Sequence, residues 1–278
     1  MGVYGLIIEM EWSSEVVKIL LLNSSYRKDG NTARVLECIK EEILLTAGRQ
    51  GLSAEFETVS LAHSDVQICR GCRGCFDRGE KSCPLKDEVP GIKERLDSAD
   101  GVVLASPVYV EDVNGIMKNW IDRMAFNNHR PAFSGKPAII LTTSGTYSSK
   151  HALKTMERAF NAWGGISVGK DRFRTGALTG KEDIKIKNLK KIKKLSARLY
   201  NAITHKTERY PSVYSLIYFK VQQKYWQRTK DTWTFDYTYW KEKGWLNNDC
   251  SYYTRNSAGW IKIKFARLLG SIISGLFT

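Results

Sequence analysis

The first two thirds of the chain alternate between two patterns of apolar and polar residues. Short apolar runs predict buried strands at positions 16–22, 54–59, 101–105 and 138–143. A fifth, shorter strand is expected after Gly165. Apolar residues at helical spacing predict helices at positions 31–48, 87–96, 115–124, 150–163 and 181–203. This alternation is typical of an α/β fold with a doubly wound, five-stranded parallel sheet.

Polar loops follow three of the predicted strands, at the edge where such sheets bind ligands: 24–32, 106–114 and 143–149. In the first loop, hydroxyls, an amide and a cation stand at the start of a helix, on Ser25, Arg27, Asn31 and Thr32. The helix dipole and the free N–H groups there favour an anion. Neither the P-loop nor the Rossmann glycine pattern is present. The alternative is that Asn31 only caps the helix and Arg27 is solvated.

Four of the six cysteines lie within fifteen residues of the loop 67–84, at Cys69, Cys72, Cys75 and Cys83. Their spacing resembles the bacterial ferredoxin run C-x2-C-x2-C-x3-C-P with a longer last spacer, a pattern that binds a [4Fe–4S] cluster. Gly71 and Gly74 permit a sharp backbone, and Arg70 and Arg73 favour thiolates. Zinc held by four thiolates, and cysteines without metal, are the alternatives.

The net charge of +14 is concentrated in the last third of the chain. Residues 181–278 hold 20 of the 43 Lys and Arg, 7 of the 29 Asp and Glu, and 18 of the 31 aromatic residues. One stripe of a predicted terminal helix carries Ile261, Phe265, Leu268, Leu269, Ile272 and Leu276. This amphipathic helix can pack on the rest of the chain or across a dimer, or contact an anionic membrane surface. No RRM, OB-fold or zinc-knuckle pattern supports a nucleic acid, and we expect no such partner.

The N-terminus has no basic segment, and its short apolar stretch contains Glu9 and Glu11, so it is not typical of a secretory signal. No apolar run is long enough to cross a bilayer. We therefore expect a cytoplasmic protein whose membrane association, if it has one, is peripheral and uses the terminal helix. The four histidines form no paired motif and no G-x-S-x-G sequence occurs. We expect no catalytic side chain.

Three segments of the chain form a recognisable series of motifs: Ser25-Tyr26-Arg27-Lys28-Asp29-Gly30-Asn31-Thr32, Ser106-Pro107-Val108-Tyr109 and Met117-Lys118-Asn119-Trp120-Ile121-Asp122-Arg123. In this order they resemble the flavodoxin-like NAD(P)H-dependent FMN reductases, over about residues 17–200. With the cysteines included, the chain looks most like the iron–sulfur flavoprotein branch. The resemblance implies an FMN phosphate held by Ser25, Arg27, Asn31 and Thr32. It implies a ribityl chain and ring edge lined by Pro107, Val108 and Tyr109, and an isoalloxazine contacted by Thr143, Ser144 and Gly145.

The resemblance also implies a function: an oxidoreductase that passes electrons between NAD(P)H or ferredoxin and an acceptor, through FMN and a [4Fe–4S] cluster. The alternatives are an NAD(P)H-dependent FMN or quinone reductase without a cluster, and an electron carrier that serves a larger complex. In relatives the cluster of one subunit approaches the flavin of its neighbour, so a homodimer or homotetramer is implied. We expect two units, an FMN-binding domain at 1–204 and a basic, aromatic-rich extension at 205–278.

Overall fold

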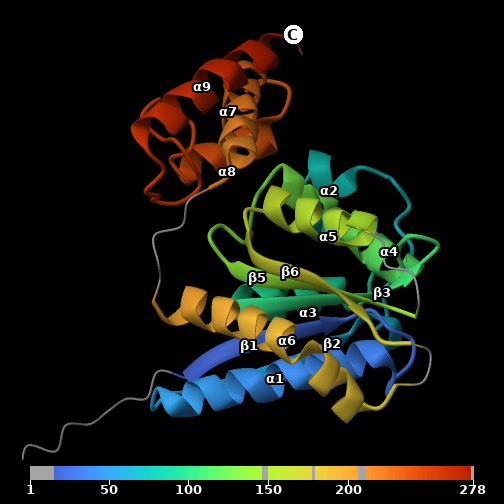
Figure 1. The fold of residues 1–278 in the computed structure, drawn as a ribbon. Helices are drawn as coiled ribbons and strands as arrows, with labels where there is room; N and C mark the ends of the chain where they lie inside the picture. The colour runs from blue at the N-terminus through green and yellow to red at the C-terminus, as the bar shows by residue number, and fades with distance from the viewer. Residues whose placement is uncertain (1–15, 146–149, 177–178, 206–210, 277–278) are drawn as a thin grey trace, which may run out of the picture.

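The parallel sheet is the centre of the computed structural model, which describes residues 16–145, 150–176, 179–205 and 211–276 (Figure 1). Five parallel strands pair in the order β2-β1-β3-β5-β6. Their bounds are β1 Val16–Asn23, β2 Ser53–Ser60, β3 Gly101–Tyr109, β5 Pro137–Ser144 and β6 Ile166–Arg174. The predicted flavodoxin-like, doubly wound parallel sheet is confirmed. The sheet has a sixth strand, β4 (Asp112–Val113), which pairs antiparallel with β3 and is too short to form a pattern in the sequence.

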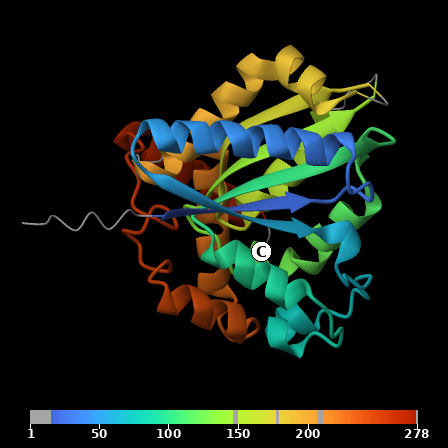
Figure 2. The same cartoon turned by 90° about the horizontal axis from the view of Figure 1, so that it is seen from below.

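Helices cover both faces of the sheet, as Figure 2 shows from below. α1 (Asn31–Arg49) and α6 (Lys181–Thr204) share one hydrophobic core with one face. α3 (Val89–Ser98), α4 (Gly115–Arg123) and α5 (Lys150–Ala162) share another core with the opposite face. Ile186 and Leu189 of α6 do not contribute to these cores, because they lie on its solvent side, 73% and 39% exposed. The apolar residues that hold α6 on the sheet are Ile184, Ile192, Leu195 and Leu199.

The aromatic residues beyond position 210 build a third hydrophobic core. It lies among α7 (Val213–Arg228), α8 (Thr234–Glu242) and α9 (Trp260–Gly275). Its buried members are Leu216, Phe219, Trp226, Trp240, Trp245, Tyr252, Tyr253, Ala258 and Ala266. Ring pairs in tilted and edge-to-face geometry join Phe219 to Trp240 and Trp240 to Trp245. The extension is therefore a small helical unit with its own core. None of the described helices is both long and apolar enough to span a bilayer.

Candidate functional site

The carboxyl ends of the central strands bring the first and third polar loops together. Pro107 of β3 is paired with Thr143 of β5, so these two strands end at the same level. The hydroxyl of Thr32, in the first turn of α1, lies 2.7 Å from that of Thr143. The Asn31 amide donates to the Gly176 carbonyl, 2.6 Å away, just after β6. Two hydrogen bonds thus fix the start of α1 against the ends of β5 and β6.

The N-terminus of α1 has no side-chain cap. Gly30 is the N-cap residue, no side chain accepts a hydrogen bond there, and the first turn contains no acidic residue. Asn31 is therefore not the cap, because Gly30 holds that position and the Asn31 amide is bound to Gly176, whereas Arg27 is exposed as the alternative expected. Arg27 is exposed in the loop just before the helix. Free N–H groups, the helix dipole and a nearby guanidinium together suit an anion such as a phosphate.

The second loop is attached to the first through Asn114, a residue that the sequence interpretation missed. Asn114 is buried, caps α4 and donates from its amide to the Ser24 carbonyl at 2.6 Å. Its position directly before a predicted helix is the only sequence signal that could have identified it. Pro107 and Val108 are half-buried, and Tyr109 is exposed at the end of β3.

The third loop offers a buried polar atom without a partner. The Oγ of Ser144 is inaccessible to solvent and has no hydrogen-bond partner in the described part of the chain. Burial of an unpaired hydroxyl is unfavourable, so this atom suits a ligand that hydrogen-bonds to it. Gly145 is exposed next to it, and positions 146–149 of the predicted loop lie outside the described residues. The residues of the three loops therefore fit a phosphate-bearing cofactor at this edge.

The four clustered cysteines line a single cavity of about 600 Å³ beside α3 and α4. Cys69 and Cys72 are exposed, whereas Cys75 and Cys83 are partly buried. The backbone turns sharply between them, with φ of 62° at Gly71 and 61° at Arg73, before the short helix α2 (Gly74–Asp77). Three-residue spacing and these turns place all the thiols around one space.

An ion pair between Arg123 and Asp87 forms part of the cavity wall. The guanidinium of Arg123 donates to both carboxylate oxygens of Asp87, one of them at 3.0 Å, and lies 3.9 Å from the Cys83 sulfur. Burial acts to raise the pKa of Asp87, but the hydrogen bonds from Arg123 and the Gln67 N–H outweigh it and hold that pKa below its usual value. The sequence interpretation missed this pair, whose members are 36 residues apart.

The electrostatics of the cavity suit an anionic group bound by thiolates. Burial, and then the nearby Cys83 and Cys69, raise the pKa of the Cys75 thiol. Because Arg123 lies 3.9 Å from the Cys83 sulfur, it offers positive charge to a thiolate that a metal centre deprotonates. Among the described residues no three His, Cys, Asp or Glu side chains converge on a single ion. Four cysteines around one cavity match the thiolate ligand set of an iron–sulfur cluster and also that of a zinc site.

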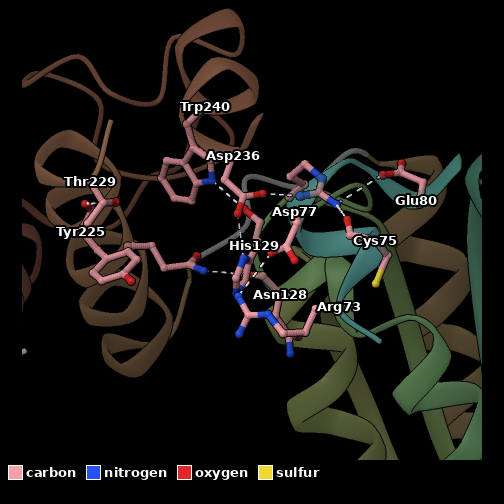
Figure 3. Close-up of polar contacts among 12 residues, drawn as sticks. Arg73, Cys75, Asp77, Glu80, Asn128, His129, Tyr225, Thr229, Asp236 and Trp240 are labelled. Atoms are coloured by element: carbon pink, nitrogen blue, oxygen red, sulfur yellow. Dashed lines mark hydrogen bonds and ion pairs between the residues drawn. The ribbon is translucent and has the colours of Figure 1, made fainter. Parts of the chain in front are cut away.

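The helical extension contacts the cysteine loop through a network of polar side chains (Figure 3). Asp236 of α8 is fully buried and accepts hydrogen bonds from His129, at 2.8 Å, and from Arg130. Arg130 also donates to the Cys75 carbonyl at 2.5 Å. The indole of Trp240 donates to the His129 carbonyl at 2.7 Å. Arg130 thus links the buried carboxylate of Asp236 to the backbone of Cys75 through two hydrogen bonds.

Aromatic contacts strengthen the same junction. A side chain at Gly79, where φ is 88°, would collide with the Phe235 ring at 2.6 Å. The guanidinium of Arg73 lies 5.2 Å from the ring centre of Trp233, and that of Arg130 lies 4.8 Å from the ring centre of Phe235. Nothing in the sequence pattern links these residues, since they are far apart along the chain.

The parallel sheet, the uncapped start of α1 after β1 and the cysteine-lined cavity place the chain in the flavodoxin-like class of α/β proteins. Residues 17–177 match the family described as NADPH-dependent FMN reductase, so the chain belongs to that family. It lies in the iron–sulfur flavoprotein branch and is an FMN-dependent oxidoreductase, as the resemblance implied.

Curated relatives support this assignment along most of the chain. An iron–sulfur flavoprotein of Archaeoglobus fulgidus is 29% identical over 231 residues, 83% of this chain and 100% of the relative. An iron–sulfur flavoprotein of Clostridioides difficile is 28% identical over 200 residues, 72% of this chain and 84% of the relative. The solved structure of RosB with a bound intermediate has a TM-score of 0.53 at 16% identity, over 68% of this chain and 79% of RosB, which supports the shared fold.

Proposed function

We propose that this oxidoreductase passes electrons between NAD(P)H or ferredoxin and an acceptor through FMN and a [4Fe–4S] cluster. The observation that carries the proposal is the arrangement of Cys69, Cys72, Cys75 and Cys83 around one cavity, with Arg123 against the Cys83 sulfur. FMN accepts a hydride and releases single electrons, whereas an iron–sulfur cluster transfers one electron at a time. The family supports a nicotinamide donor in general.

The three loops at the carboxyl edge are the proposed FMN site. The first-turn N–H groups of α1, with Ser25, Arg27, Asn31 and Thr32, would hold the phosphate. Pro107, Val108 and Tyr109 would line the ribityl chain and the ring edge, and Thr143, Ser144 and Gly145 would contact the isoalloxazine. The unpaired Ser144 hydroxyl and the uncapped helix support this assignment, since both are polar groups that lack a partner within the described chain.

The cysteine loop is the proposed cluster site, with all four thiols as ligands. Arg123 would offset the negative charge of four thiolates, and Asp87 would hold the guanidinium in place. Cys83 fits this role in spite of the longer spacer, because the Arg123–Asp87 pair stands beside it. Peptide N–H groups and the guanidinium near the sulfurs would tune the potential of the bound group.

Substitution of one ligand tests the cluster directly. The Cys72→Ser protein should lose most of its iron and acid-labile sulfide and keep FMN, because the flavin site uses none of its atoms. The control is Cys250→Ser, which removes a partly buried cysteine of the extension and should leave iron content unchanged. Full iron and sulfide in Cys72→Ser would refute the ligand set.

The electron donor separates the leading proposal from its alternatives. Rapid bleaching of the flavin absorbance by NADH or NADPH supports a reductase, with or without the cluster. Bleaching only by reduced ferredoxin supports an electron carrier for a larger complex. Anaerobic stopped-flow mixing with each donor in turn makes this comparison.

A homodimer or homotetramer in the cytoplasm belongs to the same proposal. The exposed Cys69 and Cys72 support it, because a second subunit can approach the cluster on that side. Light scattering after size exclusion measures the mass in solution. A strictly monomeric cluster-loaded protein would contradict the oligomer.

A further inference from the structure

The outermost helix of the extension turns its large apolar side chains towards solvent. Five of them on α9, together with Leu276 directly after it, are between 56% and 77% exposed: Trp260, Ile261, Phe265, Leu268, Ile272 and Leu276. Five of these six residues belong to the stripe predicted from the sequence, whose remaining member, Leu269, is partly buried. No described part of this chain covers it. Contiguous exposed apolar surface of this kind marks an interaction site.

Small residues explain why α9 is oriented in this way. Its buried face consists of Ala266, Gly270 and Ser274, which lie against α7. A Cβ atom at Gly270 would come within 2.8 Å of the Lys220 Cβ and 3.0 Å of the Ile217 carbonyl oxygen. Close packing of the two helices therefore requires the small face to point inward. The large apolar residues are left on the outside by the same geometry.

The surroundings of the stripe are positively charged. α9 contains Lys262, Lys264 and Arg267 and no acidic residue. Lys262 and Arg267 donate to the carbonyls of Pro211 and Asn248, which are neutral, so their charges are not compensated by those bonds. At the other end of the helix, Arg228 donates to the Ser274 carbonyl at 2.9 Å.

Neighbouring groups reinforce this positive region. Asp236, the acidic residue in the first turn of α8, is buried in its pair with Arg130 and adds nothing to the surface. The apolar stripe is therefore flanked by positively charged side chains. This combination complements a surface that is both anionic and partly apolar.

We propose that the outer face of α9 docks this protein onto an anionic membrane surface. Ile261, Phe265, Leu268 and Ile272 enter the boundary between headgroups and acyl chains, Trp260 lies at headgroup depth, and the cations face lipid phosphates. A second copy of the chain fits less well, because pairing two α9 faces would bring the three cations of each helix together. α9 lies at the end of the molecule away from the sheet, where docking leaves α1 and α6 free (Figure 1).

Vesicle flotation of the full-length chain tests the docking surface. The intact protein should float with vesicles of phosphatidylcholine plus phosphatidylglycerol and remain unbound with phosphatidylcholine alone. Added salt should weaken the binding, because charge screening removes part of the attraction. Leu268→Ser with Ile272→Ser should lower the partition coefficient about tenfold, since two exposed apolar anchors are lost. Lys264→Gln should weaken binding to the anionic vesicles without change of fold.

A double substitution elsewhere serves as the matched control. Ile186→Ser with Leu189→Ser removes two exposed apolar side chains from α6 and should float like the intact protein. Circular dichroism melting shows that each variant is folded. Failure of the intact chain to bind anionic vesicles would overturn the proposal, as would equal flotation of the α9 variant. A change of oligomeric mass in that variant, without vesicle binding, would instead identify the face as a contact between copies.

Discussion

Ser144 and Asp87 each bury a polar group of the side chain. The effect of that group on stability depends on whether it has a hydrogen-bonding or charged partner. The hydroxyl of Ser144 is buried and unpaired, whereas the carboxylate of Asp87 is fully buried but paired with Arg123. An unpaired polar atom costs free energy in the cofactor-free protein and becomes favourable when a ligand bonds to it. A paired charge becomes costly only when its partner is removed. The two sites therefore respond in opposite ways to substitution.

Ser144→Ala should separate folding from cofactor binding. We expect the free energy of unfolding of FMN-free protein to rise by about 1 kcal/mol, because an unsatisfied hydroxyl is removed. FMN affinity should fall about fivefold, the equivalent of one hydrogen bond of about 1 kcal/mol. Thr142→Val is the control. Thr142 also buries an unpaired hydroxyl and points to the same face of β5, but it lies further from the end of the strand. Fluorescence titration with FMN measures the affinity, and unchanged binding in Ser144→Ala would remove this residue from the site.

Asp87→Asn should lower the free energy of unfolding by about 3 kcal/mol, because the buried Arg123 loses its counter-charge. Asp122→Asn is the control: its pair with Lys118 is about half exposed, and its loss should cost about 0.5 kcal/mol or less. Urea unfolding of both variants gives the comparison.

The same residue predicts a pH dependence with a definite sign. The folded-state pKa of Asp87 is lowered, so its stabilisation is present above the usual Asp pKa of about 3.9. It is lost as the pH falls through the lower, folded-state pKa, and the loss should be absent in Asp87→Asn. Parallel acid unfolding curves for the two proteins would contradict the assignment.

At the scale of elements, α8 and the cysteine loop behave as one structure. Asp236→Asn should cost about 3 kcal/mol of unfolding free energy, because Arg130 is buried and loses its closest carboxylate. Arg130 also holds the Cys75 carbonyl, so alkylation of Cys75 in metal-free protein should become faster. Asp249→Asn, an exposed change of the same kind in the extension, should alter neither quantity. Lower stability with unchanged Cys75 reactivity would show that the network supports only the fold.

Elements also show how far the sequence determines the structure. Strand β1 was predicted at 16–22 and helix α6 at 181–203, and each ends one residue later, because continuous burial or helical spacing defines them locally. The contact between Asp236 and Arg130 joins positions 106 residues apart, and no periodicity encodes such a pairing. Helical spacing identified the apolar stripe of α9. It did not reveal that Gly270 turns that stripe away from α7, because spacing does not say what a face contacts.

The candidate sites also contain some residues that local sequence suggests and others that only the folded structure brings in. The sequence offers Ser25, Arg27, Asn31 and Thr32 as candidates because a polar loop directly follows a buried strand. The partners that connect the loops, Asn114 and Gly176, were not, since they come from other parts of the chain.

At the scale of the whole molecule, three hydrophobic cores position the candidate sites. Two cores hold helices on the faces of the sheet and thereby fix the loops at its carboxyl edge. The third core holds the extension, whose α8 supports the cysteine loop while α9 faces outward. The molecule therefore presents the proposed flavin edge, the cysteine cavity and the basic apolar surface of α9 as three distinct parts.

The most direct test of the two-centre account is the ultraviolet–visible spectrum of anaerobically purified protein, with iron and acid-labile sulfide measured on the same sample. We predict flavin bands over a broad shoulder at about 400 nm, with about four irons and four sulfides per chain. Flavin bands alone, after cluster reconstitution has been attempted, would contradict the cluster and leave a simple FMN reductase. A colourless protein that does not bind added FMN would contradict the flavin site as well.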